Sequence, residues 1–318
     1  MKALVSERQI ANETRSSGKP AGIKRNVNGV LLLDKPVGMT SNQALQTVKA
    51  IYKARKAGHT GSLDPLASGL LPICFGEATK ISGFLLDADK EYAVECKLGA
   101  RTDTGDAEGR ILETGTVPTL DRDYILKVFS RFHGGITQIP PMYSAIKHQG
   151  QRLYDLAREG IVVPREPRKI FIHALELSGY SNDSLAFNVR CSKGTYVRTL
   201  AEDVARELGC LAYVNALRRI SVGEYRSMYS LDEVRHFSQI GFSALDNLLM
   251  PIDSALNDWS KVQLGAEAVW YFQRGQAVMA PGAPTDGWVC VYGNGRFLGI
   301  AEVLSDGRIT PRRLLETG

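Results

Sequence analysis

The pattern of apolar and polar positions divides the chain into short extended and helical segments. A continuous apolar run at Gly29–Leu33 predicts a buried strand. Strict alternation at Tyr92–Leu98 and at Leu185–Cys191 predicts two strands with one face in the core. Apolar residues at helical spacing predict helices that follow Thr40 and Thr195. The chain is therefore predicted to mix strands and helices.

Cap residues support the helix predictions. Thr40 and Gln43 have the spacing of a capping box, and Gly209 stands just past the end of the helix that Thr195 opens. Further helices are predicted near Glu77–Leu86 and over residues 121–133. An extended segment is predicted at Ile139–Ser144, because proline biases its predecessor away from helix.

The C-terminal part reads as a second unit. Residues 240–252 look like a linker. Two apolar runs, Trp288–Tyr292 and Phe297–Ile300, flank the turn Gly293–Gly295, which is a strong hairpin signal. The pattern predicts a small β-rich unit after the linker.

The segment Gly58–Leu71 lacks an apolar period across its first half and gathers turn-formers, hydroxyls, His59 and a single carboxylate. That carboxylate, Asp64, is the only acidic residue between Asp34 and Glu77. Asp64 followed by Pro65 is typical of a helix start, with Asp64 as N-cap. A catalytic carboxylate is the other interpretation. The two are compatible, because a capping carboxylate is also fixed and ionised. His59 by itself is typical of a turn.

Arg198 lies in the first turn of a predicted helix, where a cation opposes the helix dipole at a typical cost of ~0.3–1 kcal/mol. It could extend to solvent, pair with Glu202 one turn on, or meet an anion from elsewhere in the fold. A second basic region, Lys147–Lys169, carries six basic and three acidic residues around Tyr154. It is either a solvated face or a contact surface for a polyanion.

Composition limits the function classes. Lys plus Arg number 39 and Asp plus Glu 34, so the net charge of +5 permits a polyanionic partner without requiring one. The five cysteines are scattered without a C-x-x-C pair, which disfavours a zinc site and fits reduced thiols in the cytoplasm. The sequence has no signal-peptide core and no apolar run of membrane-spanning length. Residues 1–28, with six basic and two acidic residues, are predicted to be a disordered basic tail.

Four blocks carry a family resemblance. Gly58–Pro65 continues through Gly76–Lys80, and Lys90–Tyr92, Cys191–Arg198 and Leu217–Arg219 follow in order. These blocks resemble the signature of the TruB family of tRNA pseudouridine synthases, closely over about residues 29–225 and loosely beyond.

The resemblance implies an α+β fold with a mixed, mainly antiparallel sheet flanked by helices. It assigns residues 29–250 to a catalytic domain that carries an RNA-gripping insertion at about 121–170. Residues 251–318 would form a small PUA-like β-barrel, in which Arg296, Arg308, Arg312 and Arg313 would suit phosphate contacts.

The resemblance also implies isomerisation of uridine 55 in the T-loop of tRNA to pseudouridine, after the base is flipped out. Asp64 would be the nucleophile, and Arg198 would pair with it, with room for a two-point contact. Tyr92 would stack on the base and take the C5 proton. The residues do not decide whether Asp64 attacks C6 of the base or acts at ribose C1′. The predicted substrate-binding residues are His59, Leu217, Tyr196, Lys35, Arg152, Arg158 and Arg165.

The implied reaction is redox-neutral, so neither a metal nor an organic cofactor is expected. The implied partner is the tRNA T-arm stem-loop, bound by a monomer without guide RNA. Two alternatives remain: an RNA-binding or tRNA-folding module, and a guide-RNA-dependent relative. Intact Asp64, Tyr92 and Arg198 argue against the first, and the segment Pro140–Lys169 favours the standalone enzyme over the second.

Overall fold

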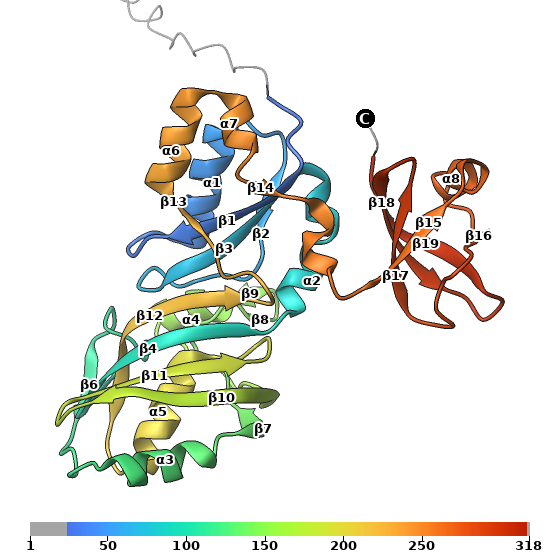
Figure 1. Cartoon of the computed structure of the whole chain (residues 1–318). Coiled ribbons are helices and arrows are strands. Elements are labelled where there is room, and N and C mark those ends of the chain that lie inside the picture. The colour runs from blue at the N-terminus through green and yellow to red at the C-terminus, as the bar shows by residue number, and fades with distance from the viewer. Residues whose placement is uncertain (1–23, 317–318) are drawn as a thin grey trace, which may run out of the picture.

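The computed structural model describes residues 24–316 as a large mixed sheet with helices on it and a smaller β-rich unit beside it (Figure 1). The first 23 residues of the predicted basic tail lie outside the described residues. Residues 24–28 pack on the body: Val27 is buried, and Arg25 forms an ion pair with Asp246. No helix within residues 24–316 is long and apolar enough to cross a membrane.

The large sheet is mixed and mainly antiparallel, as expected. Its strand order is β13-β1-β3-β12-β4-β11-β10-β7, with β14 paired to β1 and β2 paired to β3. Among the strands of this sheet within residues 24–316, only the β1–β13 and β3–β12 pairs are parallel. The strands are β1 Gly29–Lys35, β2 Ala57–His59, β3 Ser68–Phe75, β4 Lys90–Leu98, β7 Gly134–Gln138, β10 Arg168–Tyr180, β11 Ser184–Cys191, β12 Ala212–Val222, β13 Tyr229–Ser230 and β14 Leu249–Met250.

Helices cover the sheet in two groups (Figure 1): α1, α6 and α7 lie over the part near β1, and α3 and α5 over the part near β11. The capping box of Thr40 and Gln43 is present at the start of α1, as predicted. Gly209 follows α5 in the left-handed conformation, at φ +81°. The helices are α1 Ser41–Ile51, α2 Ser82–Asp87, α3 Arg122–Ser130, α4 Leu153–Arg158, α5 Val197–Glu207, α6 Leu231–Ile240, α7 Phe242–Asp246 and α8 Ala266–Phe272, with 3₁₀ turns at Gly76–Lys80 and Ile252–Leu256.

The interpretation of Asp64 as a helix N-cap is wrong. Residues 64–67 form an irregular turn, in which Ala67 N–H donates to the Asp64 carbonyl, and the chain then enters β3. Tertiary pairing overrides the local cap signal here, because β3 lies between β1 and β12 and is buried along almost its whole length. The Asp64 side chain therefore does not cap a helix.

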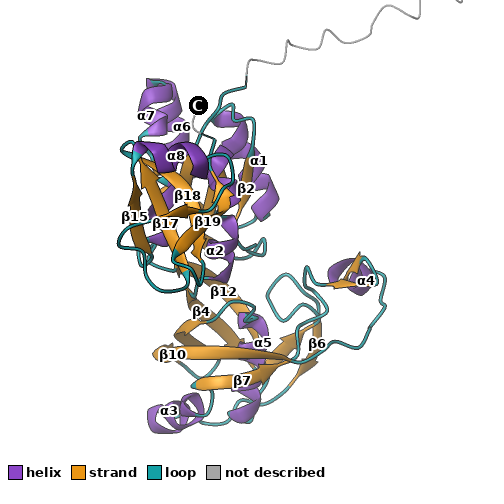
Figure 2. Ribbon diagram, turned by 90° about the vertical axis from the view of Figure 1, so that its right-hand side faces the viewer, coloured by secondary structure: helices purple, strands orange, loops and turns teal. Residues whose placement is uncertain are grey.

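The predicted insertion at 121–170 divides into two parts in the structure. Helix α3 packs in the main core, and β7 pairs with β10. The remaining residues, about 139–167, leave the sheet and form the hairpin β8 Lys147–His148 and β9 Gln151–Arg152 followed by α4. Figure 2 shows this hairpin and helix standing apart from the sheet on long connections. A second short hairpin, β5 Ala100–Thr102 with β6 Ile111–Thr114, follows β4 and closes another loop.

The C-terminal unit is a curled sheet of five strands in the order β15-β17-β18-β19-β16, a half-barrel rather than a closed one. The predicted hairpin is present, and Asn294 and Gly295 both have positive φ, as the tight turn requires. The unit packs on the body through an apolar cluster that includes Ile81, Leu256 and Ile300. Its strands are β15 Ser260–Leu264, β16 Val278–Met279, β17 Trp288–Gly293, β18 Arg296–Val303 and β19 Arg308–Leu314.

Candidate active site

A cavity of about 1020 Å³ lies between the body and the 139–167 segment. Residues of the Gly58–Leu71 segment, the start of α1, the loop at 102–109 and the 139–167 segment line it, together with Arg198. Five of the predicted site residues line this cavity: His59, Asp64, Arg198, Arg152 and Arg158.

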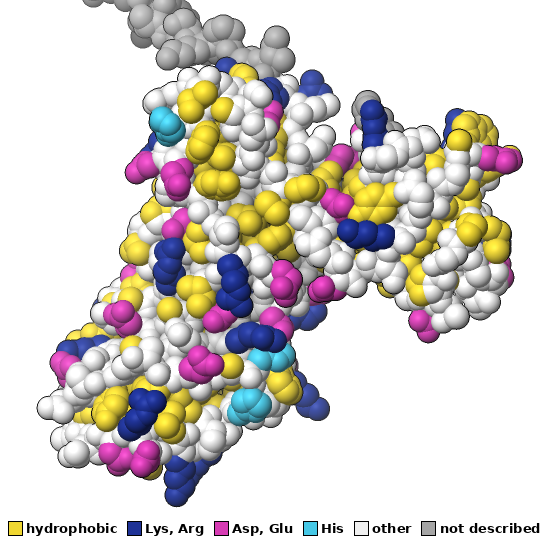
Figure 3. Space-filling model, in the orientation of Figure 1, with side chains coloured by type: hydrophobic (Ala, Val, Ile, Leu, Met, Phe, Trp, Pro, Cys, Tyr) yellow, Lys and Arg dark blue, Asp and Glu magenta, His cyan; other side chains and the backbone are white. Residues whose placement is uncertain are grey.

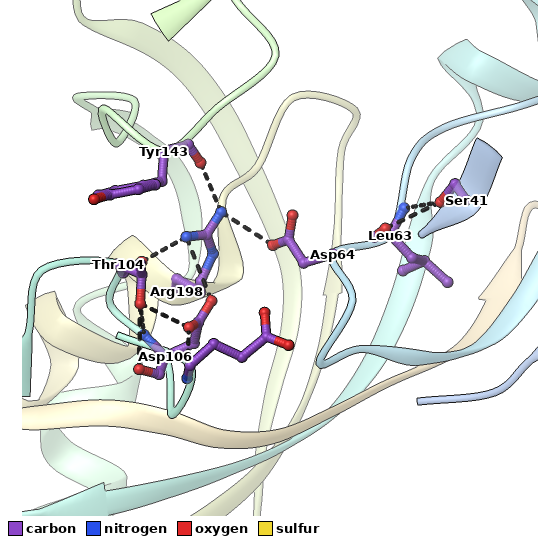
Figure 4. Close-up of polar contacts among 8 residues, drawn as sticks. Ser41, Leu63, Asp64, Thr104, Asp106, Tyr143 and Arg198 are labelled. Carbon is purple, nitrogen blue, oxygen red and sulfur yellow. Dashed lines mark hydrogen bonds and ion pairs between the residues drawn. The ribbon is translucent and has the colours of Figure 1, made fainter. Parts of the chain in front are cut away.

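The centre of the site is an ion pair between elements far apart in the sequence. Nη2 of Arg198 lies 3.0 Å from Oδ2 of Asp64 (Figure 4). The Arg198 side chain is only 8% exposed, whereas that of Asp64 is 44% exposed. The carboxylate is therefore the half of the pair that a ligand in the cavity can reach.

Arg198 has more than one partner, which corrects the expected two-point contact with Asp64. Its Nη1 lies 3.5 Å from Oδ2 of Asp106 and donates to the Thr104 carbonyl. Its Nη2 also donates to the Tyr143 carbonyl at 2.8 Å. Figure 4 shows the guanidinium between these groups. No ion pair joins Arg198 to Glu202, and a guanidinium held by so many acceptors has a fixed orientation.

The loop at 102–109 supplies the acidic residue that sequence reasoning missed. Asp106 is 3% exposed, and its Oδ1 accepts hydrogen bonds from the Thr104 hydroxyl at 2.7 Å and the Glu108 N–H at 3.1 Å. Backbone bonds in both directions between this loop and Val214 fix it to β12. The sequence signal was present in the acidic, glycine-rich composition of the loop, but nothing local indicated its contact with Arg198.

Glycine at position 109 is required for this loop to close. A Cβ there would lie 2.3 Å from the Thr104 hydroxyl oxygen and 2.5 Å from a carboxylate oxygen of Asp103. Any larger residue would therefore displace the turn that carries Asp106.

A buried arginine contacts the Gly58–Leu71 segment through its backbone. Arg219, on β12, is 1% exposed, and it donates to the carbonyls of Leu70 at 2.7 Å and Gly61 at 3.1 Å. Burial, together with the Arg219 charge, lowers the pKa of His59. Arg219 is also the cross-strand partner of Tyr92. Burial raises the pKa of the Tyr92 phenol, and the Arg219 charge acts against that shift.

Tyr92 and Leu217 lie on the neighbouring strands β4 and β12, in the body rather than among the cavity-lining residues. Leu217 is buried and pairs with Val94. Tyr196 precedes α5 and exchanges two hydrogen bonds with the Gln138 side chain. None of the three contacts the Asp64–Arg198 pair through a hydrogen bond.

Two of the predicted substrate-binding residues are placed differently. Lys35 has no exposed surface, and its ammonium donates to the carbonyls of Pro36 at 2.8 Å and Met39 at 2.6 Å. Burial lowers its pKa to about 8. Lys35 thus supports the turn after β1 rather than presenting a charge to the cavity. Arg165 lines a separate cavity of about 240 Å³ on the insertion.

Comparison with known proteins shows which family the chain resembles. A model described as the N-terminal domain of TruB family pseudouridylate synthases matches residues 49–197, and two TruB C-terminal domain models match residues 198–257 and 260–315. A "tRNA pseudouridine synthase B" of Nitrosococcus oceani is 56% identical over 294 residues, which is 92% of this chain and 96% of that protein. One of Pseudomonas fluorescens strain Pf-5 is 52% identical over 299 residues, 93% of this chain and 98% of that protein.

Among solved structures, the "Crystal Structure of a Cbf5-Nop10-Gar1 Complex" matches with a TM-score of 0.67 at 25% identity, covering 87% of this chain and 78% of that one. Fold, site and sequence matches together define a pseudouridylate synthase, an isomerase. Within that class, the chain belongs to the TruB family.

Proposed function

We propose that this enzyme converts uridine 55 in the T-loop of tRNA to pseudouridine, with Asp64 as nucleophile and without cofactor or guide RNA. The relatives that match it over more than nine tenths of its length are named tRNA pseudouridine synthase B. The observation that carries the mechanistic part is the pair of half-exposed Asp64 and buried Arg198, 3.0 Å apart at the cavity wall.

The reaction moves one bond within a nucleotide. The C1′–N1 bond breaks, the uracil turns, and C5 bonds to C1′; C5 loses a proton and N1 gains one. Asp64 attacks an electron-poor carbon of the uridine, and Arg198 favours the ionised, nucleophilic carboxylate. Asp106 is buried and pairs with Nη1 of Arg198, whereas Asp64 pairs with Nη2. Asp64 is therefore the carboxylate available to the substrate.

The target base has to leave the T-loop to reach Asp64, at a cost of a few kcal/mol of stacking and pairing. The cavity of about 1020 Å³ has room for a flipped nucleotide. In this proposal Tyr92 stacks on the base and receives the C5 proton, Leu217 packs beneath it, and His59 contacts the flipped nucleotide. Burial raises the pKa of the Tyr92 phenol, and the charge of Arg219, its cross-strand partner, acts against that shift.

Contacts with the phosphate backbone offset the cost of flipping. Arg152 and Arg158 line the cavity on the insertion side, and their guanidinium groups lie 5.8 and 5.5 Å from the Tyr154 ring centroid. We propose that these two arginines and Tyr154 grip the T-arm stem-loop.

The direct test is turnover of an unmodified T-arm stem-loop by the purified full-length protein, with no guide RNA added. We expect stoichiometric conversion at the one target uridine, and no conversion when that uridine is replaced by cytidine. Binding without conversion would identify an RNA-binding module instead. Conversion only after addition of a guide RNA and its protein partners would identify a guide-dependent enzyme.

A further inference from the structure

The hydroxyl of Ser41 closes a two-way hydrogen bond with the backbone of Leu63. Ser41 Oγ donates to the Leu63 carbonyl at 3.0 Å and accepts from the Leu63 N–H at 2.7 Å (Figure 4). Ser41 is 4% exposed, and Leu63 is also buried. One side chain thus satisfies both polar groups of the residue that directly precedes Asp64.

This contact matters because residues 61–67 have no regular secondary structure. On either side of Leu63 the segment is held through backbone carbonyls: Arg219 donates to Gly61, and the Gly38 N–H donates to Pro65 at 2.8 Å. Leu63 itself has no strand partner. Its backbone orientation, and hence the direction in which Asp64 leaves the chain, depends on Ser41.

The support behind Ser41 is rigid. Ser41 is the first residue of α1, whose start is fixed by the capping box of Thr40 and Gln43. Ala44, Leu45 and Val48 hold the same helix in the main core. A hydroxyl on a helix held in this way fixes the irregular loop at a defined position relative to the core.

We propose that Ser41 is a positioning residue for the isomerisation. It acts through the Leu63 backbone to hold the Asp64 carboxylate in line with Arg198 and the substrate carbon. This proposal rests on the role proposed for Asp64. Misplacement of a reacting group by about 1 Å can cost roughly 100-fold in rate. Although Ser41 lies at the cavity, both hydrogen bonds of its hydroxyl go to the Leu63 backbone.

The test compares Ser41→Ala with Ser221→Ala in full-length protein. Ser221 is the matched control, because it is also a serine of 4% exposure but lies on β12 with its hydroxyl directed to Glu91. We expect Ser41→Ala to lower the single-turnover rate constant by roughly 10- to 100-fold with little change in stem-loop affinity. Ser221→Ala should keep the wild-type rate. Ser41→Thr, which retains the hydroxyl, should recover most of the loss.

A second readout does not depend on activity. Loss of the Ser41 hydroxyl removes the acceptor of the Leu63 N–H, so exchange of that amide should accelerate in Ser41→Ala and stay slow in Ser221→Ala. If Ser41→Ala does not fold, Ser41→Cys carries the test, because a thiol keeps the size but bonds weakly.

Two outcomes would overturn the positioning role. One is a Ser41→Ala rate equal to that of Ser221→Ala, and the other is unchanged protection of the Leu63 amide. An inactive wild-type protein would instead reject the proposed function, while the exchange measurement would still report on the Ser41–Leu63 contact.

Discussion

The arginines of the insertion and those of the C-terminal unit look alike in the sequence but differ in the structure. Arg152 and Arg158 face the cavity, contact the Tyr154 ring and pair with no carboxylate within residues 24–316. In the C-terminal unit, Arg308 pairs with Asp306 at 2.6 Å. Arg312 and Arg313 there donate to the Glu302 carboxylate and the Arg312 carbonyl, respectively.

The difference shows that the number of basic residues does not locate an RNA surface. An arginine paired with a neighbouring carboxylate exchanges one anionic partner for another when it meets a phosphate, so it gains less than an arginine without a carboxylate partner. On the face shown in Figure 3, basic side chains are interspersed with acidic ones and form no continuous stripe. The expectation that Arg308, Arg312 and Arg313 serve phosphate contacts is thereby weakened, and the cavity becomes the main candidate for charge recognition.

Arg198→Lys keeps the positive charge but is expected to have the largest effect on the reaction rate among the arginine variants compared here. The planar guanidinium of Arg198 contacts Asp64, Asp106 and two carbonyls at once, and the compact ammonium of a lysine cannot make all of these contacts. Disturbing a buried charge pair costs about 2–5 kcal/mol, and about 1.4 kcal/mol is a factor of ten in rate. We expect single-turnover conversion to slow by roughly 100-fold or more. A lysine variant with a near-normal rate would show that the multi-point contact is dispensable.

A smaller effect is expected for Asp106→Asn. The amide keeps the size and can still accept from the Thr104 hydroxyl, but it no longer balances Arg198. We expect the loss of this ionic contact to raise the barrier by about 1.4 kcal/mol, so the rate constant should fall roughly tenfold. Asp103→Asn is the matched control, since Asp103 lies in the same loop but pairs with the exposed Arg110. Equal rates for the two variants would remove Asp106 from the catalytic network.

Replacing both Arg152 and Arg158 by Gln should act on binding rather than on chemistry. Each lost phosphate contact lowers the log–log salt slope by roughly 0.7–0.9. We expect weaker binding of the bare stem-loop and a slope reduced by one to two such steps, with an unchanged rate at saturating RNA. Binding at several salt concentrations measures both quantities.

The smallest effect on the stem-loop is expected for Arg308→Gln together with Arg312→Gln, which serves as the counterpart of the insertion variant. Both arginines are engaged by carboxylates within their own unit. Stem-loop affinity and salt slope should therefore match the wild type. If this pair weakens binding as much as the insertion pair, the contrast between the two regions is wrong.

Features set by local chemistry were predictable from the sequence. The capping box of α1, the alternating strands β4 and β11 and the turn at Asn294–Gly295 all follow from residues close in the chain. The Asp64–Arg198 pair came from the family resemblance, and it is confirmed by a distance of 3.0 Å.

Features set by distant segments were not predictable. Asp64 looks like a helix cap, but the residues that follow it lead into β3, which pairs with β1 and β12 instead of forming a helix. Lys35 is predicted to bind substrate, but its ammonium is buried and donates to two backbone carbonyls. Asp106 meets Arg198 only because its loop is fixed to Val214 on β12. In each case the outcome depends on tertiary structure that the local sequence pattern does not predict.

The most direct test of the account is single-turnover conversion of the T-arm stem-loop by Asp64→Asn, with RNA affinity measured on the same preparation. Asparagine keeps the size of Asp64, while the negative charge and the nucleophile are lost. The account predicts no detectable pseudouridine and an affinity close to that of the wild type. Conversion at even about a tenth of the wild-type rate would correspond to a loss of only about 1.4 kcal/mol in the barrier and would contradict Asp64 as the nucleophile.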